Sequence, residues 1–328
     1  MIDGNPNAGP LAWPGGPEGT VVTVGSFDGV HRGHWHLLQT LTATAARLHR
    51  PALLVTFDPH PLAIVRPDHA PPLLSTPAEK IEVLAESGLD YLIFLRFDRI
   101  LAGYSPAKFV DDVLIGRFRM SHLVIGYDHG FGKDRSGDAE MLQRIGRERG
   151  FGVDVVPPVG GRGKPVSSTA IRHALAAGDV TVAAAGLGRP YSLRATVIRG
   201  DGRGRSLGFP TANLRPPDAR KLLPRSGIYA VRAQLPGRLA EGVLHIGPRP
   251  TFPGAESTIE LHLFDFEEDL YGRDAIVSFC AFLRDVERFD SIPGLIDAIE
   301  ADCAAARRLF AGGGGACHAR HGGISFKD

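Results

Sequence analysis

The chain has 328 residues, of which 43% are hydrophobic and 22% charged, and its formal net charge is +1. This length favours two domains over one, and the near-zero charge excludes the broad basic face with which proteins bind nucleic acid or anionic membranes. Glycine is frequent, with 41 residues. These glycines either fill flexible segments or mark places where the backbone approaches a ligand.

The N-terminal segment and the cysteines suggest a compartment. The segment lacks the basic start and apolar core of a secretory signal, and no apolar run approaches the ~18 residues that span a bilayer. Cys280, Cys303 and Cys317 are odd in number and far apart, so they predict neither a disulfide framework nor a metal site. We therefore expect a cytoplasmic protein.

In the first half, short apolar segments alternate with helical patterns. The expected strands are Val21–Val24, Leu53–Phe57, Tyr91–Leu95, His122–Gly126 and Val153–Val156. Helix starts are indicated by the capping box Thr76-Pro77-Ala78-Glu79 and by Ser105-Pro106. This alternation predicts an α/β domain with a Rossmann-like parallel sheet covered on both faces. Nucleotides in such folds bind beyond the carboxyl ends of the strands.

After Gly178 the pattern changes to short strands and turns, which predicts a compact antiparallel β-barrel. The expected strands are Ser192–Arg199, Gly227–Gln234, Gly242–Ile246, Thr258–Phe266 and Ala275–Leu283, and a closing helix covers Ile292–Phe310. We expect domains at residues 20–178 and 191–310, joined by a linker at 179–190. Residues 1–19 and 311–328 lack an apolar period and are expected to be disordered.

The first expected strand leads into GSFDGVHRGHWHLL, residues 25–38. Gly25 allows a tight turn, and Gly33 lets the backbone approach a ligand where the next helix begins. His31 and His34 are three residues apart, so both can face that helix N-terminus and stabilise charge on a phosphate. The alternative is a glycine-rich strand–helix turn with two surface histidines. The preceding strand and the FDG triplet favour the phosphate site.

Two later segments follow expected strands and support the phosphate site. Residues 124–137 form a second glycine loop with Asp128 and Arg135. Residues 166–172, VSSTAIR, place hydroxyls at a helix start and Arg172 one turn further, which suits phosphate contacts. The serines could instead serve only as N-caps. A parallel sheet would bring all three segments to one edge.

These motifs resemble the nucleotidyltransferase superfamily marked by HxGH and SSTxxR, and within it the FMN adenylyltransferase module of bacterial bifunctional FAD synthetases. GSFDGVHRGH, TFDPHP (residues 56–61), the GxDxxFGxxRxG frame and SSTAIR carry the resemblance. It implies that His31 and His34 are catalytic and stabilise the transferring α-phosphoryl group of ATP. The implied ATP-binding residues are Gly25, Phe27, Asp28, Gly33, Arg135, Ser168, Thr169 and Arg172, and the implied FMN-binding residues are Asp58, His60 and Asp128. His129-Gly130 departs from the family, which more often has an aromatic residue followed by a basic one.

A second glycine-rich loop, IRGDGRGRSLGFPTANL, spans residues 198–214. Thr211 and Asn213 are two residues apart, so in an extended segment both point to one side and offer hard oxygen ligands of the kind that Mg²⁺–ATP accepts. Glu260 occupies a polar position in an otherwise hydrophobic strand, where a carboxylate could take a proton from a substrate hydroxyl. The alternatives are two polar strand residues and a solvent-facing glutamate.

This half resembles riboflavin kinase across essentially its whole length. GDGRGRSLGFPTANL (200–214), ELHLFDFEEDLYG (260–272) and FLRDVERFDS (282–291) carry much of the resemblance. The implied ATP-binding residues are Gly200, Gly202, Gly204, Arg205, Gly208, Thr211 and Asn213. The resemblance further implies that Thr211 and Asn213 bind Mg²⁺ and that Glu260 is the general base on the riboflavin 5′-hydroxyl. Arg284 and Glu287 would flank the flavin.

Together the resemblances imply a bifunctional enzyme that phosphorylates riboflavin to FMN in its C-terminal domain and adenylates FMN to FAD in its N-terminal domain. ATP and the flavins are then substrates or products, and no nucleic-acid or membrane partner is expected; the oligomeric state stays open. One alternative, favoured by the His129-Gly130 departure, is a riboflavin kinase whose N-terminal domain uses another acceptor or is inactive. A second is a non-catalytic flavin-binding regulator, against which the intact phosphoryl-transfer residues argue.

Overall fold

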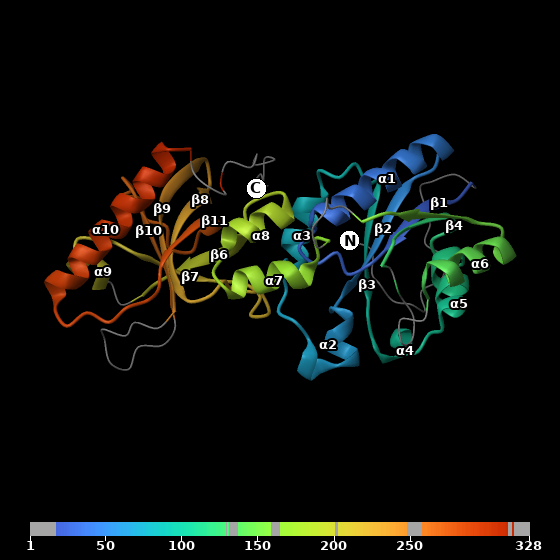
Figure 1. Ribbon diagram of the computed structural model, residues 1–328, viewed down its shortest axis with the longest axis horizontal. Coiled ribbons are helices and arrows are strands. Elements are labelled where there is room, and N and C mark those ends of the chain that lie inside the picture. Colours follow the sequence, from blue (N-terminus) through green and yellow to red (C-terminus); the bar gives the residue numbers. More distant parts are fainter. Residues whose placement is uncertain are drawn as a thin grey trace. The chain divides into compact units, whose positions relative to one another are not determined.

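The structure, a computed structural model, describes residues 18–128, 130, 137–158, 165–200, 203–247, 258–313 and 317. The chain divides into two compact units, Met1–Val166 and Ser167–Asp328, drawn in Figure 1. The boundary between the two functional domains that the sequence predicts lies further along the chain, near residue 178. The helix that begins at Ser168 therefore belongs to the second compact unit, although its sequence motif resembles that of the first domain.

The first unit contains a five-stranded parallel sheet. Its strands are β1 (Thr20–Val24), β2 (Ala52–Asp58), β3 (Tyr91–Arg96), β4 (Met120–Gly126) and β5 (Gly152–Val156). They pair in the order β3-β2-β1-β4-β5, and every pairing is parallel. Its helices are α1 (Arg32–Leu48), α2 (Pro61–Val65), η1 (Pro67–His69), α3 (Pro77–Leu84), α4 (Arg99–Ala102), α5 (Pro106–Lys108), η2 (Phe109–Ile115) and α6 (Ala139–Arg149). The predicted strands and their parallel arrangement are confirmed.

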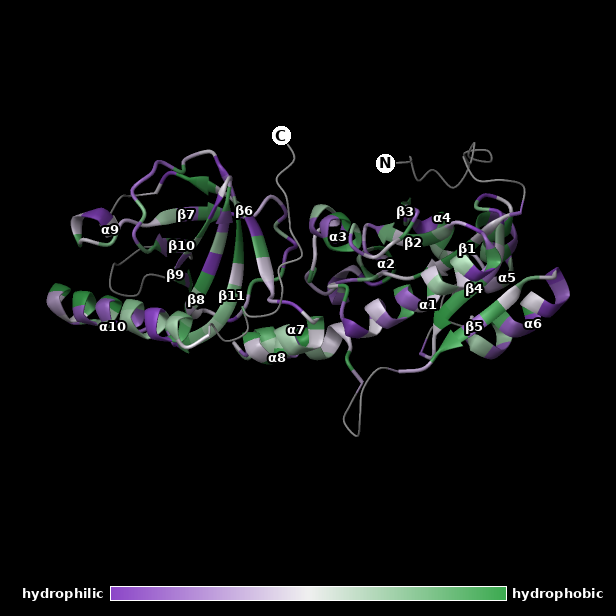
Figure 2. Ribbon diagram, turned by 90° about the horizontal axis from the view of Figure 1, so that it is seen from above, coloured by the Kyte–Doolittle hydropathy of each residue, from purple (hydrophilic) through white to green (hydrophobic). Residues whose placement is uncertain are grey.

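Helices cover both faces of this sheet (Figure 2). On one face, Leu38 and Leu41 of α1 are fully buried in a cluster that includes Val21 of β1. On the other face, Leu142 of α6 and Phe118 pack with Val22, the next residue of β1. Full burial of such a side chain contributes about 1.5–3 kcal/mol. The two clusters explain why the strands read as continuous apolar runs rather than as an alternating pattern.

The helix starts also agree with the sequence. At α3 the Thr76 N–H donates to Glu79 Oε2 at 2.9 Å, and the Glu79 N–H donates to Thr76 Oγ1 at 3.3 Å. This is the predicted capping box. Ser105 caps α5 by accepting the Lys108 N–H at 3.2 Å, and the chain then widens into the π-helix η2.

The chain reverses its winding direction at β1, because β2 and β3 extend the sheet on one side and β4 and β5 on the other. The crevice beyond the carboxyl ends of β1 and β4 is therefore a topological switch point, where ligands bind in open α/β sheets. Gly25 follows β1 directly, and Asp128 follows β4 by two residues. The fold thus brings two predicted site segments to one edge.

The second unit is a closed antiparallel barrel with the strand order β10-β7-β6-β11-β8-β9. Its strands are β6 (Ser192–Ile198), β7 (Ala212–Arg215), β8 (Gly227–Leu235), β9 (Arg238–Gly247), β10 (Thr258–Leu263) and β11 (Asp274–Arg284), and its helices are α7 (Ser168–Ala176), α8 (Val180–Leu187), α9 (Arg203–Ser206) and α10 (Ile292–Ala311). Burial alternates along β6 because one face of the strand lines the barrel core. Figure 2 shows polar and apolar bands alternating along β8. The predicted barrel and closing helix are confirmed; the short strand β7 is an addition.

The barrel also buries the helices that precede and follow it. Leu175 of α7 and Val180 of α8 are fully buried, and the Leu175 carbonyl accepts the Arg225 N–H at 3.0 Å. Ala306 and Phe310 of α10 belong to a buried cluster on the barrel. Because α7 and α8 are fixed in this way, they belong to the second compact unit.

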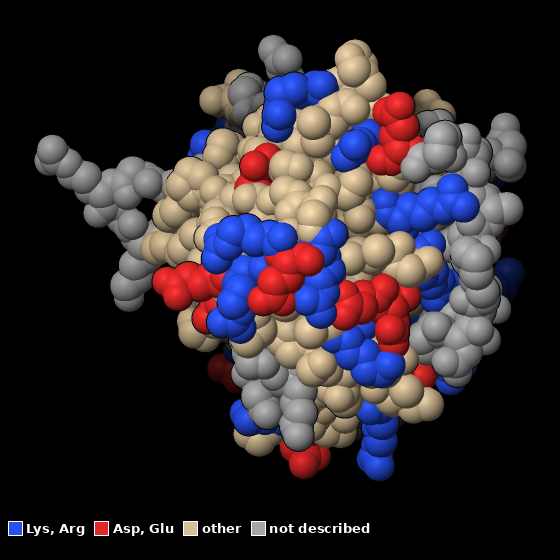
Figure 3. Space-filling view, turned by 90° about the vertical axis from the view of Figure 1, so that its right-hand side faces the viewer, with Lys and Arg blue, Asp and Glu red and all other residues tan. Residues whose placement is uncertain are grey.

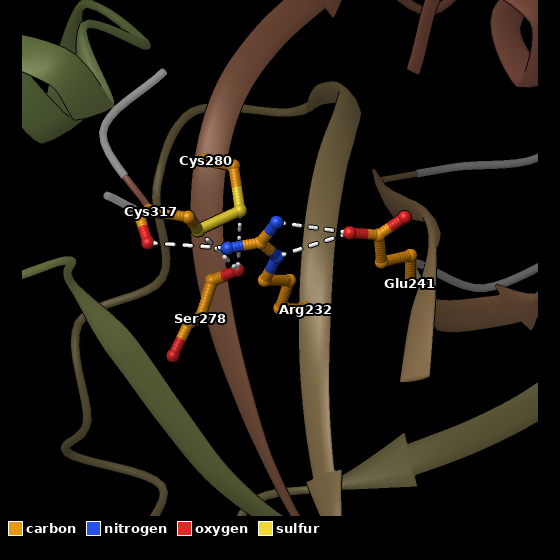
Figure 4. The surroundings of a disulfide bond; sticks show 5 residues. All are labelled: Arg232, Glu241, Ser278, Cys280 and Cys317. Atoms are coloured by element: carbon orange, nitrogen blue, oxygen red, sulfur yellow. Dashed lines mark hydrogen bonds and ion pairs between the residues drawn. A yellow bond between two sulfur atoms is a disulfide. The ribbon is translucent and has the colours of Figure 1, made fainter. Parts of the chain in front are cut away.

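Cys280 and Cys317 form a disulfide bond, so the expectation that the cysteines build none is wrong (Figure 4). The two residues are 37 positions apart, and α10 lies between them and returns the chain to β11. Cys317 is 3% exposed, and its carbonyl accepts a hydrogen bond from Arg232 Nη1 at 3.3 Å. Spacing could not reveal this proximity, because the helix creates it. Cys317 is an ordered part of the expected tail, and cysteine usage no longer supports a reducing compartment.

Charges of both signs are mixed on the face of the molecule drawn in Figure 3, where Lys and Arg side chains interleave with Asp and Glu. Such interleaving gives this face no field of a single sign that would attract a polyanion. Elsewhere in the first unit, Arg149 lies 2.7 Å from Glu148 and 3.3 Å from Asp111. Separately, no helix among the described residues combines the length and apolar composition that crossing a bilayer requires.

Candidate active sites

Hydrogen bonds of the Asp28 side chain fix the turn after β1 to the segment that precedes α3. This carboxylate, 1% exposed, accepts the N–H of Leu74 on Oδ2 and that of Ser75 on Oδ1, both at 3.0 Å. The Ser75 hydroxyl oxygen in turn accepts the Gly29 N–H at 3.0 Å, and Gly29 has a φ of 82°, which glycine adopts readily. The turn is therefore pre-formed. Asp28 stays a predicted ATP-binding residue, and in the structure its carboxylate holds the turn.

His31 and His34 cap α1 reciprocally. The His34 N–H donates to His31 Nδ1, and the His31 N–H donates to His34 Nδ1, both at 3.3 Å. The two rings stack with centroids 3.7 Å apart, and Phe27 stacks on His34 at 4.6 Å. An Nδ1 that accepts carries no proton, so each neutral ring has its proton on Nε2, from which it can be donated to an anionic oxygen. A Cβ at Gly33 would lie 3.1 Å from the His31 ring, so a larger residue there would press on that ring.

The carboxyl end of β2 meets the same turn. The Thr56 hydroxyl donates to the Ser26 carbonyl at 3.0 Å. Lys80 Nζ, from α3, donates to that carbonyl at 2.6 Å and to Thr56 Oγ1 at 3.2 Å. A small pocket opens here, and its lining residues are Asp28, Phe57, Asp58, His60, Leu73, Ser75, Pro77 and Lys80. Two predicted FMN-binding residues, Asp58 and His60, therefore share one pocket.

The remaining predicted flavin-side residue, Asp128, is exposed beyond the carboxyl end of β4. It lies at the same sheet edge as the turn after β1. Arg135 and His129 lie outside the described residues, so the structure places neither.

The SSTAIR motif forms the start of α7. Ser167 is the N-cap, and its Oγ accepts the Ala170 N–H at 3.2 Å. Ser168 and Thr169 are then the first two helical residues, and Arg172 follows one turn later. The hydroxyls and the N-terminal N–H groups of the helix at this end suit an anion. Of the two serines, only Ser167 is the N-cap.

In the barrel, two glycines let the loop before β7 close on Thr211 and Asn213. A Cβ on Gly200 would lie 1.9 Å from Asn213 Nδ2, and one on Gly204 would lie 2.8 Å from Thr211 Oγ1 and 2.4 Å from the Phe209 carbonyl oxygen. Any larger residue would displace either the loop or the side chains of Thr211 and Asn213. The other predicted residues of the loop are Gly208, with a φ of 89°, Arg205, exposed on α9, and Gly202, outside the described residues.

Glu260 lies opposite these side chains. It pairs with Asn213 in the antiparallel register of β10 and β7, and its Oε2 accepts a hydrogen bond from Thr211 Oγ1 at 3.5 Å. The Thr258 hydroxyl donates to Glu260 Oε1 at 2.7 Å. A carboxylate held by two hydroxyls is oriented to accept a proton. The structure thus brings Thr211, Asn213 and Glu260 together.

The donor set at this site fits Mg²⁺. A hydroxyl, an amide carbonyl and a carboxylate are hard oxygen ligands, and protein-bound Mg²⁺ usually completes its shell with waters and substrate phosphates. The loop at Gly200 packs on the nitrogen side of the Asn213 amide, since its Cβ would be 1.9 Å from Nδ2 but 3.2 Å from Oδ1. Among the described residues, no cluster of three His, Cys, Asp or Glu could hold a metal by itself. A metal here would therefore depend on these mixed donors and on nucleotide phosphates.

Arg284, expected at the flavin, is engaged in a two-pronged pair with Asp302 of α10. Arg284 Nε and Nη2 donate to Asp302 Oδ1 and Oδ2, each at 2.8 Å. Burial raises the pKa of Asp302, and the hydrogen bond from Arg284 opposes that rise. The pair fixes the end of β11 to α10, whereas Glu287 is exposed in the connecting segment.

Three residues of these sites were missed from the sequence. Thr258 stands two positions before Glu260, and an i, i+2 pair on one strand face could have revealed it. Lys80 is a cation in the first turn of a helix, where the macrodipole disfavours it, and that anomaly is its only sequence signal. Ser75 carried no signal, because its partners Asp28 and Gly29 are 47 and 46 residues away.

The fold and these sites define a two-domain transferase, in which an α/β domain with a parallel sheet is joined to an antiparallel barrel with a glycine-rich loop. Residues 14–170 match the family model for FAD synthetase, and residues 187–310 match that for riboflavin kinase. The chain belongs to the bifunctional riboflavin kinase/FMN adenylyltransferase family.

Relatives under that name align over nearly the whole chain. The protein from Escherichia coli strain K12 is 40% identical over 294 residues, covering 89% of this chain and 93% of its own. The protein from Pseudomonas fluorescens is 41% identical over 295 residues, covering 90% and 94%. A solved structure described as the macrolide-efflux protein from Streptococcus pneumoniae superposes with a TM-score of 0.81 at 33% identity, covering 89% of this chain and 95% of that one. The fold is thus shared over both domains.

Proposed function

We propose that the described residues divide the two reactions of this family between the two domains, with FMN adenylation at the N-terminal site and riboflavin phosphorylation in the barrel. Family membership supports both activities. It also removes the basis for the two alternatives left open by the sequence, an N-terminal domain without this activity and a non-catalytic flavin binder. We propose a role for each of the individual residues in these two reactions.

In the N-terminal reaction, an FMN phosphate oxygen attacks the α-phosphorus of ATP, and pyrophosphate leaves with the bridging oxygen. The nucleophile is already ionised, so no general base is needed. His31 and His34 would donate Nε2–H bonds to the α-phosphoryl oxygens as their charge grows, and the N-terminus of α1 would add its dipole. Remaining contacts would come from Gly25, Phe27, Gly33, Arg135, Ser168, Thr169 and Arg172 around the nucleotide, and from Asp58, His60 and Asp128 around the flavin. This grouping keeps the functional boundary near residue 178.

In the barrel reaction, Glu260 would accept the proton of the riboflavin 5′-hydroxyl as its oxygen attacks the γ-phosphorus of ATP and ADP leaves. The glycine loop would cradle the phosphates. Thr211 and Asn213 would hold Mg²⁺, which neutralises charge on the transferring phosphate. Glu287 and the β11–α10 junction fixed by Arg284 would flank the flavin.

The observation that carries the kinase assignment is the register of Glu260 against Asn213, with Thr211 Oγ1 3.5 Å from the carboxylate. The test supplies purified protein with ATP and Mg²⁺, and either riboflavin or FMN, and separates products by chromatography. Asn213→Ala should abolish FMN formation and leave FMN-to-FAD conversion intact. A folded variant that lost both activities would contradict the division of roles.

We further propose that the enzyme uses Mg²⁺, that it is located in the cytoplasm and that its only partners are small molecules. The oxygen donors at Thr211, Asn213 and Glu260 support the metal, and the formal net charge of +1 supports the lack of a polyanionic partner. Replacing Mg²⁺ with Ca²⁺ in the assay tests the first point, because Ca²⁺ prefers a larger and looser oxygen shell. Cell fractionation tests the second.

A further inference from the structure

Lys80 is a buried cation that has no role in the two reactions as proposed above. It is 6% exposed and lies in the first turn of α3. Burying an ammonium is costly, and the positive end of a helix adds to that cost. Burial lowers the pKa of Lys80 to about 8, while Asp28 and Asp58 oppose the shift. A lysine kept at such a position next to a candidate site indicates a functional requirement.

The contacts of Lys80 join the two strand ends that form the site. Its Nζ donates to the Ser26 carbonyl at 2.6 Å and to Thr56 Oγ1 at 3.2 Å. Ser26 lies in the turn that leads to His31, whereas Thr56 lies two residues before Asp58. One ammonium group therefore fixes the turn that carries the histidines relative to the loop that carries the flavin-side residues.

The charge of Lys80 interacts with two carboxylates, Asp28 and Asp58. Asp28 and Asp58 line the same pocket as Lys80, and His60 is the third titratable group around it. Two carboxylates near a site for phosphates repel those phosphates, since charges interact strongly where water is scarce. The ammonium group also lies 5.7 Å from the centre of the Phe94 ring. This ring carries no charge that could neutralise the ammonium group.

We propose that Lys80 is a positioning residue of the adenylyltransferase site: it holds the turn after β1 at the correct distance from the end of β2, and its positive charge makes the pocket tolerant of the FMN phosphate. This inference rests on the proposed adenylyltransferase site. The proposed role requires the charged form of the Lys80 side chain. The rate of FMN adenylation should therefore depend on pH as well as on the hydrogen bonds of Lys80.

The first experiment compares Lys80→Met and Lys80→Arg in the full-length protein. Lys80→Met should lower kcat/KM for FMN adenylation 10- to 100-fold, chiefly through KM, because it removes both the hydrogen bonds and the charge. Riboflavin phosphorylation, measured on the same sample, should be unchanged, and an unchanged circular-dichroism spectrum and thermal midpoint show that the N-terminal domain is folded. Lys108→Met is the matched control, since Lys108 is an exposed lysine of α5 whose partner is Asp112, and it should leave both activities unchanged.

The second experiment records kcat/KM for FMN from pH 7 to pH 10, which reports the free enzyme. Carboxyl and imidazole groups ordinarily titrate below this range. The wild-type value should fall above pH 8, roughly tenfold by pH 9, as Lys80 loses its proton. Lys80→Arg keeps its charge throughout, so its profile should remain flat over that interval.

Three outcomes would overturn the proposal: a folded Lys80→Met variant with unchanged kcat/KM, a Lys80→Arg variant with no adenylation, or an alkaline decline identical in Lys80→Arg and wild type. Failure of the proposed function itself would look different. In that case the wild-type protein would convert no FMN to FAD at any pH, whatever residue stood at position 80.

Discussion

His31 and His34 each use Nδ1 to accept the backbone N–H of the other, at 3.3 Å in both directions. The same two rings therefore start α1 and are the ones proposed to act on a phosphate. Because Nδ1 is fixed by the backbone, the direction of each Nε2 is fixed as well. The geometry of the proposed donors is thus set by a helix cap rather than by flexible side chains.

Substitutions of His31 can separate its role as the N-cap of α1 from its proposed role as a hydrogen-bond donor to the phosphate. In His31→Asn the amide oxygen can still cap α1, but no Nε2–H reaches the phosphate. We expect FMN adenylation to fall about 10²–10³-fold, the usual loss of one transition-state donor, with the midpoint of thermal unfolding almost unchanged. His31→Ala should show the same loss of activity and also lose about 0.5–2 kcal/mol of stability.

Both rates are measured as FAD formed from FMN and ATP, with riboflavin phosphorylation on the same sample as the reference. If His31→Asn kept most of the adenylation rate, His31 would be a cap only. The catalytic role would then have to move to other residues.

Gly200 should tolerate no side chain, because a Cβ there would lie 1.9 Å from the Asn213 amide. Gly200→Ala must displace either the loop or Asn213, and we expect riboflavin phosphorylation to fall at least about 10²-fold through misplaced phosphates. Gly312→Ala is the matched control: it is in the same domain, its φ is −84°, and its Cβ would meet nothing closer than 3.4 Å. An active Gly200→Ala enzyme would show that the loop does not need this close approach.

The sequence was sufficient for the fold because its signals are local. The strand Val21–Val24 reads as one apolar run since helices bury both its sides, and Thr76 with Glu79 forms a capping box within four residues. Strand β7 was not singled out because it has four residues, too few to show a period. Its residue Asn213 was predicted from the sequence motif instead, together with Thr211 just before the strand.

The sites were predictable where partners are close in sequence and not where the fold creates the proximity. His31 with His34, and Thr211 with Asn213, are separated by three and two positions. The bond from Ser75 to Asp28 spans 47 positions and that from Lys80 to Ser26 spans 54, and no sequence period links them. The same holds for Arg284, whose guanidinium is directed to Asp302 by the packing of α10 on the barrel.

This pair yields a test of Arg284. Arg284→Met alone leaves the Asp302 carboxylate buried without a partner, which should cost about 3–5 kcal/mol of stability. The double variant Arg284→Met/Asp302→Leu removes both charges and should recover most of that loss, as measured by urea unfolding. If the guanidinium serves to fix α10 to β11, the riboflavin KM of the double variant should stay within about threefold of wild type. A much larger KM in this stable double variant would assign Arg284 a direct contact with the flavin.

The disulfide between Cys280 and Cys317 should make the stability of the barrel depend on redox state. It closes a loop of 37 positions, and constraining such a loop in the unfolded chain typically contributes about 2–4 kcal/mol. Reductant should therefore lower the thermal midpoint of the wild-type protein by several degrees. Cys317→Ser should unfold at the lower midpoint with or without reductant, while Cys303→Ser, which changes the unpaired cysteine, should still respond. Mass spectrometry after alkylation under non-reducing conditions counts the free thiols directly: one in the wild-type protein and two in Cys317→Ser. Three free thiols in the wild-type protein would show that the two sulfurs are adjacent but not bonded in solution.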